Sequence, residues 1–147
     1  MKIHVDFDDF ISLLNKHKVE YVIVGSFALF FYGQPRATGD IDIWIKPEKK
    51  NAKNVLSAIK EFGFSSLNLT LQDIISGNVI QLGYAPVRID LLTVLDGVTK
   101  EEVWNSKIAG ELGKNKVYFI GKDVYIKNKK KLGRFKDLAD IEMLGEK

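Results

Sequence analysis

The 147-residue sequence contains no cysteine, which excludes disulfides, thiolate zinc sites and cysteine nucleophiles. Its only histidines are His4 and His17, so a histidine-rich metal site is also disfavoured. Any metal ion bound by this chain must therefore be held mainly by oxygen ligands, which suits Mg²⁺.

Long apolar runs are absent as well. The longest, from Tyr21 to Tyr32, is interrupted by Gly25 and Ser26 and is too short to span a bilayer. The chain turns acidic at Asp6, where a signal peptide needs an apolar stretch. We therefore expect a cytoplasmic protein with no membrane segment. The length and a hydrophobic content of 46% fit a single domain over residues 1–147.

Strand and helix patterns alternate along the chain, and this indicates an α/β or α+β domain. Alternating or β-branched runs predict strands at 21–24, 40–45, 79–82, 87–95 and 117–120, with another near Phe64. The 3.6-residue period and capping signals predict helices at 6–17, 27–32, 47–62, 71–75, 99–105, 122–131 and 135–144. Asp6 is the expected N-cap of the first helix.

Two aspartates stand at the start of a predicted strand. In Asp40–Ile45, alternation places Asp40 and Asp42 on one face and three isoleucines on the other. Two carboxylates this close repel each other unless a cation lies between them. A divalent metal keeps both ionised, so the pair is a candidate metal site; the alternative is an ordinary amphipathic strand.

A third acid follows the same pattern. Val87, Ile89 and Leu91 share one face, and Asp90 points the opposite way beside Arg88. If this strand lies next to the Asp40 strand, three carboxylates converge. Such a set is the ligand set of a two-metal phosphoryl or nucleotidyl transfer site.

Gly25-Ser26 follows a buried strand and opens a helix. Glycine lets the backbone approach a ligand closely, and free N–H groups with the serine hydroxyl can hold phosphate. The alternative is a plain turn with Ser26 as N-cap. A Walker-type loop is excluded, because Gly113-Lys114 and Gly121-Lys122 lack its other residues.

In this order, Gly25-Ser26, Asp40-Ile41-Asp42 and Asp90 resemble the motifs of the nucleotidyltransferase superfamily of DNA polymerase β. Arg36-x-Thr38-x-Asp40-Ile41-Asp42 is similar to its branch of minimal nucleotidyltransferases and AbiE-type toxins. Gly133-Arg134-Phe135-Lys136-Asp137-Leu138-Ala139-Asp140 resembles that branch's Arg-x-Lys-Asp-x-x-Asp signature. The resemblance covers residues 19–144 and implies a mixed central sheet flanked by helices.

The resemblance implies catalytic and metal-binding roles for Asp40, Asp42 and Asp90, with two Mg²⁺ ions (Mn²⁺ as a substitute) and a nucleoside triphosphate such as ATP or GTP. It assigns nucleotide or phosphate contacts to Gly25, Ser26, Arg36, Thr38 and Lys136. Asp137 and Asp140 are expected to order the last helix. The acceptor stays open among RNA or tRNA, protein and a small molecule, and an antitoxin or other partner protein is one way to complete the acceptor site.

Two other functions compete with nucleotidyl transfer. One is a catalytically reduced, nucleotide-binding regulatory module. The other is nucleic-acid binding through a basic cluster near the C-terminus, whose alternative is a solvated helix face. That cluster comprises Lys127, Lys129, Lys130, Lys131, Arg134 and Lys136. A toxin role within a toxin–antitoxin pair rests on the family resemblance alone.

Overall fold

The computed structural model describes residues 3–34, 39–64, 68–84 and 87–145. The helices are α1 (Val5–Lys16), α2 (Gly25–Phe31), α3 (Lys49–Ile59), continued by the π-helical turn η1 (Lys60–Phe64), α4 (Leu71–Ile75), α5 (Lys100–Ser106), α6 (Lys122–Leu132) and α7 (Phe135–Met143). The strands are β1 (Tyr21–Val24), β2 (Asp40–Ile45), β3 (Ile80–Tyr84), β4 (Val87–Leu92), β5 (Ile108–Leu112) and β6 (Asn115–Phe119).

One mixed sheet carries the strands in the order β3-β4-β2-β1-β6-β5. The pairs β2–β4 and β1–β6 are parallel, and the other neighbours are antiparallel. The strand β2, which holds two of the three candidate carboxylates, therefore lies inside the sheet between β4 and β1. The predicted mixed sheet flanked by helices is confirmed.

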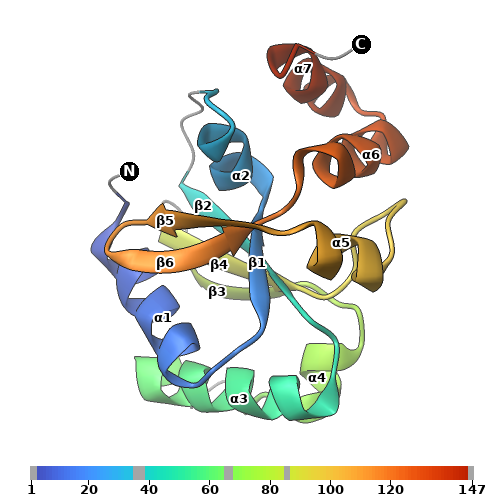
Figure 1. The fold of residues 1–147 in the computed structure, drawn as a ribbon. Coiled ribbons are helices and arrows are strands. Elements are labelled where there is room, and N and C mark those ends of the chain that lie inside the picture. Colours follow the sequence, from blue (N-terminus) through green and yellow to red (C-terminus); the bar gives the residue numbers. More distant parts are fainter. Residues whose placement is uncertain (1–2, 35–38, 65–67, 85–86, 146–147) are drawn as a thin grey trace.

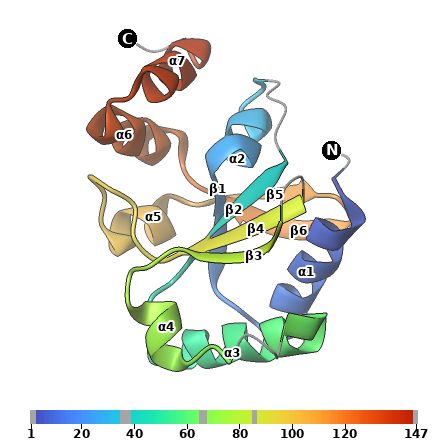
Figure 2. The ribbon, with the colours of Figure 1, turned by 180° about the vertical axis from the view of Figure 1, so that it is seen from behind.

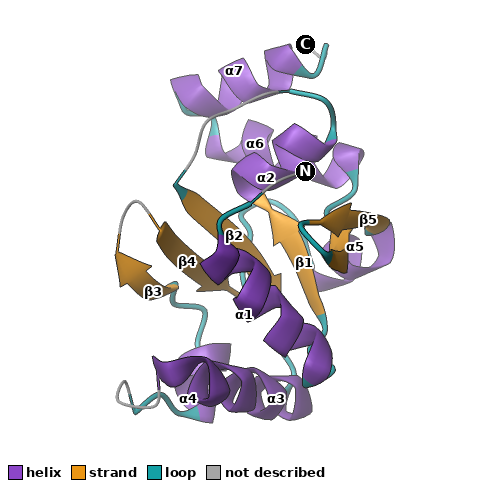
Figure 3. Ribbon diagram, turned by 90° about the vertical axis from the view of Figure 1, so that its left-hand side faces the viewer, coloured by secondary structure: helices purple, strands orange, loops and turns teal. Residues whose placement is uncertain are grey.

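Helices cover the sheet and lie at both of its ends. Figures 1 and 2 show α2, α6 and α7 at one end, with α3 and α4 at the opposite end. Figure 3 shows α1 lying across a face of the sheet. The strand β2 begins at the end occupied by α2 and α6, so its first residues lie below these helices (Figure 1).

The core forms because each central strand turns one apolar row inward. Ile41 and Ile43 are fully buried, and Ile89 and Leu91 are each 3% exposed. In a strand the intervening residues must point the other way. Burial of the isoleucine row thus fixes the direction of Asp40, Asp42 and Asp90.

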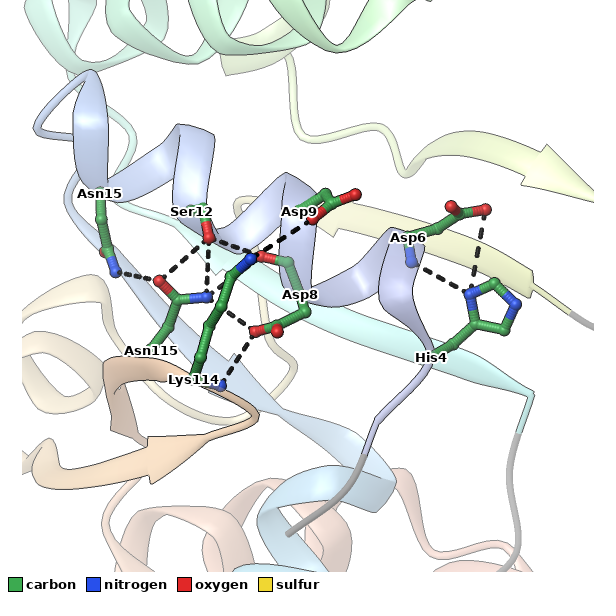
Figure 4. Close-up of polar contacts among 8 residues, drawn as sticks. All are labelled: His4, Asp6, Asp8, Asp9, Ser12, Asn15, Lys114 and Asn115. Atoms are coloured by element: carbon green, nitrogen blue, oxygen red, sulfur yellow. Dashed lines mark hydrogen bonds and ion pairs between the residues drawn. The ribbon is translucent and has the colours of Figure 1, made fainter.

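A polar cluster fastens the β5–β6 hairpin to α1 (Figure 4). Asn115 Nδ2 donates to Asp8 Oδ1 at 2.8 Å and to Ser12 Oγ at 3.0 Å. The Lys114 backbone N–H also donates to Asp8 Oδ1, at 3.2 Å. These bonds replace the solvent contacts of the turn, and we assign the cluster a structural role.

The structure departs from the predicted elements at several places, and the ends of α2, α3 and β4 are also shifted by two or three residues. Strand β5 was not predicted, because its sequence Ile-Ala-Gly-Glu-Leu lacks a β-branched run; pairing with β6 holds it. The strand expected near Phe64 is wrong, since the chain continues there as η1. The first helix begins one residue early, at Val5, with His4 rather than Asp6 as N-cap.

Other predictions hold. The capping box at Thr99 and Glu102 is formed, with bonds of 3.0 and 3.1 Å. Gly133 adopts φ +64° between α6 and α7, as expected of a helix-ending glycine. Within the described residues, every helix is too short or too polar to cross a bilayer.

Candidate active site

The strand register places Asp42 directly opposite Asp90. Strands β2 and β4 are parallel neighbours, and Asp42 pairs with Asp90 while Asp40 pairs with Arg88. All four side chains extend from the face that the buried isoleucines leave free. The condition for convergence, adjacency of the two strands, is therefore met.

Arg88 joins two of the three carboxylates. Its NH2 donates to Asp40 Oδ2 at 2.8 Å and to Asp90 Oδ2 at 3.1 Å, and its Nε donates to Asp90 Oδ1 at 3.0 Å. Such bidentate, charge-assisted bonds are the stronger class of protein hydrogen bond. The neighbouring Asp90 carboxylate raises the pKa of Arg88 further, so the guanidinium is charged.

A cavity of about 400 Å³ lies in front of Asp42 and Asp90. Helix α6 contributes Tyr125, Asn128 and Lys129 to its lining. The remaining lining residues are Val24, Gly25, Val79, Leu92, Val94, Leu95, Asp96, Ile120, Leu132 and Arg134. The lining of the cavity thus contains carboxylates together with a lysine and an arginine.

Gly25 is the point of closest approach between β1–α2 and the carboxylates. Its φ is +66°, and a Cβ at this position would overlap Asp42 Oδ2. Only glycine therefore fits here, for its backbone conformation and for the missing Cβ. The backbone of Gly25 and the carboxylate of Asp42 form one corner of the cavity.

Asp42 is the carboxylate with the most perturbed environment. Burial, followed by the charges of Asp90 and Asp40, raises the pKa of Asp42 to about 6. Lys129 acts in the opposite direction and lowers the pKa of Asp42. The carboxylate pair thus carries excess negative charge that a bound cation would neutralise.

Lys129 brings a buried positive charge to the cavity. Its Nζ lies 3.4 Å from Asp137 Oδ1 and 3.5 Å from Asp140 Oδ2, both on α7. Burial lowers the pKa of Lys129, and the charge of Asp137 raises it. Two acids from α7 therefore hold this lysine at the wall facing Asp42.

Asp137 is fixed from two sides. Arg134 Nε donates to its Oδ2 at 2.6 Å, and Arg134 NH2 donates to Oδ1 at 3.1 Å. The pKa of Asp137 is lowered to about 2, mainly by the hydrogen bonds from Arg134 and to a smaller extent by the charge of Lys129. Asp137 and Asp140 therefore do more than order their helix, because they couple α7 to the lysine in the cavity.

Comparison with known proteins shows the family and the fold of the chain. A family model described as "nucleotidyl transferase of unknown function (DUF2204)" matches residues 5–147. The chain belongs to this nucleotidyl transferase family. Its fold is similar to that of TM1012 from Thermotoga maritima, a protein described as a "putative nucleotidyltransferase" and solved by crystallography at 1.87 Å resolution. That match has a TM-score of 0.60 at 17% identity, and it covers 92% of this chain and 88% of the other. Among curated proteins, none matches this chain.

The candidate metal ligands of this family member are side chains that do not form a finished cluster. Within the described ranges, no three histidine or acidic side chains are arranged to ligate one ion. Asp42 and Asp90 nevertheless fit a divalent cation, since they face each other at a cavity and Asp42 is destabilised in its charged form. Arg88 bonds to both oxygens of Asp90 and to one oxygen of Asp40, so these two acids fit the cation only once Arg88 has left them.

The other predicted nucleotide contacts are distributed differently. Gly25 lines the cavity, whereas Ser26 is not among its lining residues. Ser26 is the second residue of α2, and the N-cap of that helix is Val24. Lys136 is exposed and is not among the lining residues. Arg36 and Thr38 lie outside the described residues.

Lys129 and Arg88 were missed as site residues by sequence reasoning. A signal existed for Lys129, because it follows Tyr125 by four residues and precedes Leu132 by three, on the inward face of α6. For Arg88 the signal was its place two residues before Asp90, which puts both side chains on one face.

The predicted basic cluster does not act as one surface. Lys129 is buried, and Lys127 Nζ is bonded to Glu102 Oε2 at 2.7 Å. Lys130 and Lys131 remain exposed at the end of α6. Lys129 thus belongs to the lining of the cavity, whereas Lys130 and Lys131 lie on the surface.

A larger cavity, of about 600 Å³, lies elsewhere. It is lined by the α1–β1 connection, Trp104 and the exposed side of β5–β6, and it holds none of the three candidate carboxylates. Size alone does not identify the site of chemistry. We take the smaller cavity as the candidate active site because Asp42, Asp90 and the buried Lys129 all line it.

Proposed function

We propose that this protein transfers a nucleoside monophosphate from a nucleoside triphosphate to an acceptor hydroxyl or phosphate. The observation that carries the proposal is the register of β2 and β4, which sets Asp42 opposite Asp90 at a cavity whose far wall holds Lys129. Carboxylates on one side and a cation on the other suit a triphosphate bound with a metal ion.

In the proposed step, an acceptor oxygen attacks the α-phosphorus and the bond from that phosphorus to the bridging oxygen breaks. Pyrophosphate leaves, and the acceptor proton passes to a carboxylate of the Asp42–Asp90 pair. Asp42 would hold Mg²⁺, together with Asp90 and Asp40 if Arg88 leaves them, and the ion would supply charge neutralisation on the phosphates. Lys129 would hold the departing phosphates, and the Gly25 backbone would border them.

The test is pyrophosphate release from each of the four α-labelled nucleoside triphosphates with Mg²⁺. Labelled acceptor is sought among RNA, protein and small-molecule pools. We expect Asp42→Asn to abolish transfer, while the matched control Asp9→Asn, an exposed acid on α1, leaves it unchanged. Retained transfer by Asp42→Asn would overturn the proposal.

A nucleotide-binding module without catalysis is the second candidate. The observation that favours it is that Arg88 occupies oxygens of both Asp40 and Asp90. Calorimetry showing tight triphosphate binding, with no pyrophosphate release against any acceptor pool, would decide for this module.

A toxin role is a narrower form of the transfer proposal and rests on family resemblance. It predicts growth arrest when the protein is expressed without a partner. Arrest that persists with Asp42→Asn would separate toxicity from nucleotidyl transfer.

A further inference from the structure

Arg88 holds the carboxylates at the oxygens that a metal ion would need. Both oxygens of Asp90 and one oxygen of Asp40 accept hydrogen bonds from its guanidinium, at 2.8 to 3.1 Å. By contrast, Arg88 makes no hydrogen bond to Asp42. Arg88 therefore forms ion pairs with two of the three acids, Asp40 and Asp90, and not with Asp42.

The geometry of the strands makes this arrangement stable. Arg88 and Asp90 are two residues apart on β4, and Asp40 is the cross-strand partner of Arg88. The planar guanidinium can bridge two carboxylates at once, which a lysine ammonium does less well. The side chain of Arg88 is 31% exposed, so the guanidinium borders solvent and has room to move away.

We propose that Arg88 is a displaceable internal counter-cation that a divalent metal ion must replace at Asp40 and Asp90. The inference rests on the metal site of the proposed function. In the cation-free protein Arg88 neutralises these two acids and fixes their side chains. Asp42 would be the first ligand available to a metal ion, and Arg88 would give up its carboxylate partners for solvent or a phosphate group.

The exchange predicts that metal affinity is limited by the bonds of Arg88 to Asp40 and Asp90. The free energy of a hydrogen bond to a charged group is large enough that its loss changes an equilibrium constant by about tenfold or more.

The test is a titration of the protein with Mn²⁺ in the absence of nucleotide. The electron paramagnetic resonance signal of free Mn²⁺ measures how much of the ion is bound. Compared with wild type, we expect Arg88→Gln to bind Mn²⁺ at least about tenfold more tightly and Arg88→Lys to lie between them. The control Lys130→Gln removes an exposed positive charge from α6 and is expected to change the affinity by less than about twofold. Unchanged or weaker binding by Arg88→Gln, with wild-type binding that depends on Asp42, would overturn the inference.

A measurement on the wild-type protein covers the case in which Arg88→Gln does not fold. The Nε–Hε signal of Arg88, assigned through its loss in Arg88→Lys, should shift and exchange faster with water on addition of Mg²⁺. A signal that stays unchanged while the metal binds at Asp42 would overturn the inference.

The outcomes separate this inference from the proposed function. If Mn²⁺ binding tightens in Arg88→Gln but no protein form releases pyrophosphate, the exchange stands and nucleotidyl transfer fails. If neither wild type nor Arg88→Gln binds Mn²⁺, both are overturned. If transfer depends on Asp42 but metal affinity is indifferent to Arg88, only the exchange fails.

Discussion

Gly25 and Asp42 are packed against each other so closely that the carboxylate occupies the space of a missing Cβ. The contact joins the end of β1 to the middle of β2, which are antiparallel neighbours with Val24 opposite Asp42. One glycine therefore sets the position of the carboxylate that faces the cavity.

Gly25→Ala should displace the Asp42 side chain and weaken Mg²⁺-dependent nucleotide binding by about tenfold or more. The new methyl group and the φ of +66° together should also lower the free energy of unfolding by about 1–2 kcal/mol. Isothermal calorimetry and urea unfolding measure the two effects.

Gly63→Ala is the matched control for Gly25→Ala. Gly63 has a φ of +109°, and a Cβ there would meet nothing within 4 Å. The Gly63→Ala substitution should lower the free energy of unfolding without changing nucleotide binding. Equal binding losses in the two variants would show that backbone strain, not the Asp42 contact, is responsible.

Asp42→Asn should stabilise the protein at neutral pH. The pKa of Asp42 rises from 3.8 to about 6 on folding, so the unfolded chain loses this proton at a lower pH than the folded protein. The stability present below pH 4 is therefore lost as pH rises from 4 to 6, by about 2 kcal/mol.

The measurement is urea unfolding at pH 4, 5, 6 and 7 without divalent cations. Asp42→Asn and wild type should differ little at pH 4, and the variant should be the more stable at pH 7. A difference that does not grow with pH would contradict the assigned environment of Asp42.

Asp137→Asn should destabilise the protein, because it leaves the buried Lys129 with one acid fewer and removes the bonds from Arg134. Loss of one partner of a buried ion pair costs about 3 kcal/mol at pH 7. The pKa of Asp137 is lowered to about 2, so this stability is present above pH 4 and is lost as pH falls towards 2.

Unfolding by denaturant at pH 7 and at pH 3 measures this effect. The gap between wild type and Asp137→Asn should narrow at the lower pH. Asp123→Asn, which changes an acid in the first turn of α6 just as Asp137 lies in that of α7, should cost only about 0.5 kcal/mol. A similar cost for both variants would contradict the burial argument.

Lys129→Met should weaken triphosphate binding by about tenfold or more, since a charge-assisted phosphate contact is lost. Lys130→Met, the next residue on the exposed side of α6, should change it by less than about twofold. Thermal shift and calorimetry with Mg²⁺ and each triphosphate give the comparison. If Lys130 matters as much as Lys129 and binding falls steeply with salt, the nucleic-acid reading would gain support instead.

Much of the fold could be predicted because local patterns and tertiary contacts agree. The isoleucines of Asp40–Ile45 alternate with acids, so burial of one row leaves only one direction for the other. The capping box at Thr99 needs only residues three apart. Strand β5 escaped prediction because its edge position depends on pairing with β6 and not on its own composition.

The candidate active site could likewise be predicted only in part from the sequence. Period-two alternation, read from the sequence alone, determined that Asp40 and Asp42 share a face and that Asp90 opposes its apolar neighbours. Only the tertiary structure decided that β4 runs parallel beside β2 with Asp42 opposite Asp90, that Arg88 spans two of the acids, and that Lys129 faces them from α6. The physical reason is that side-chain direction follows from the pleat of one strand, whereas register, bridging and burial depend on segments distant in the chain, such as Asp40 and Arg88, which are 48 residues apart.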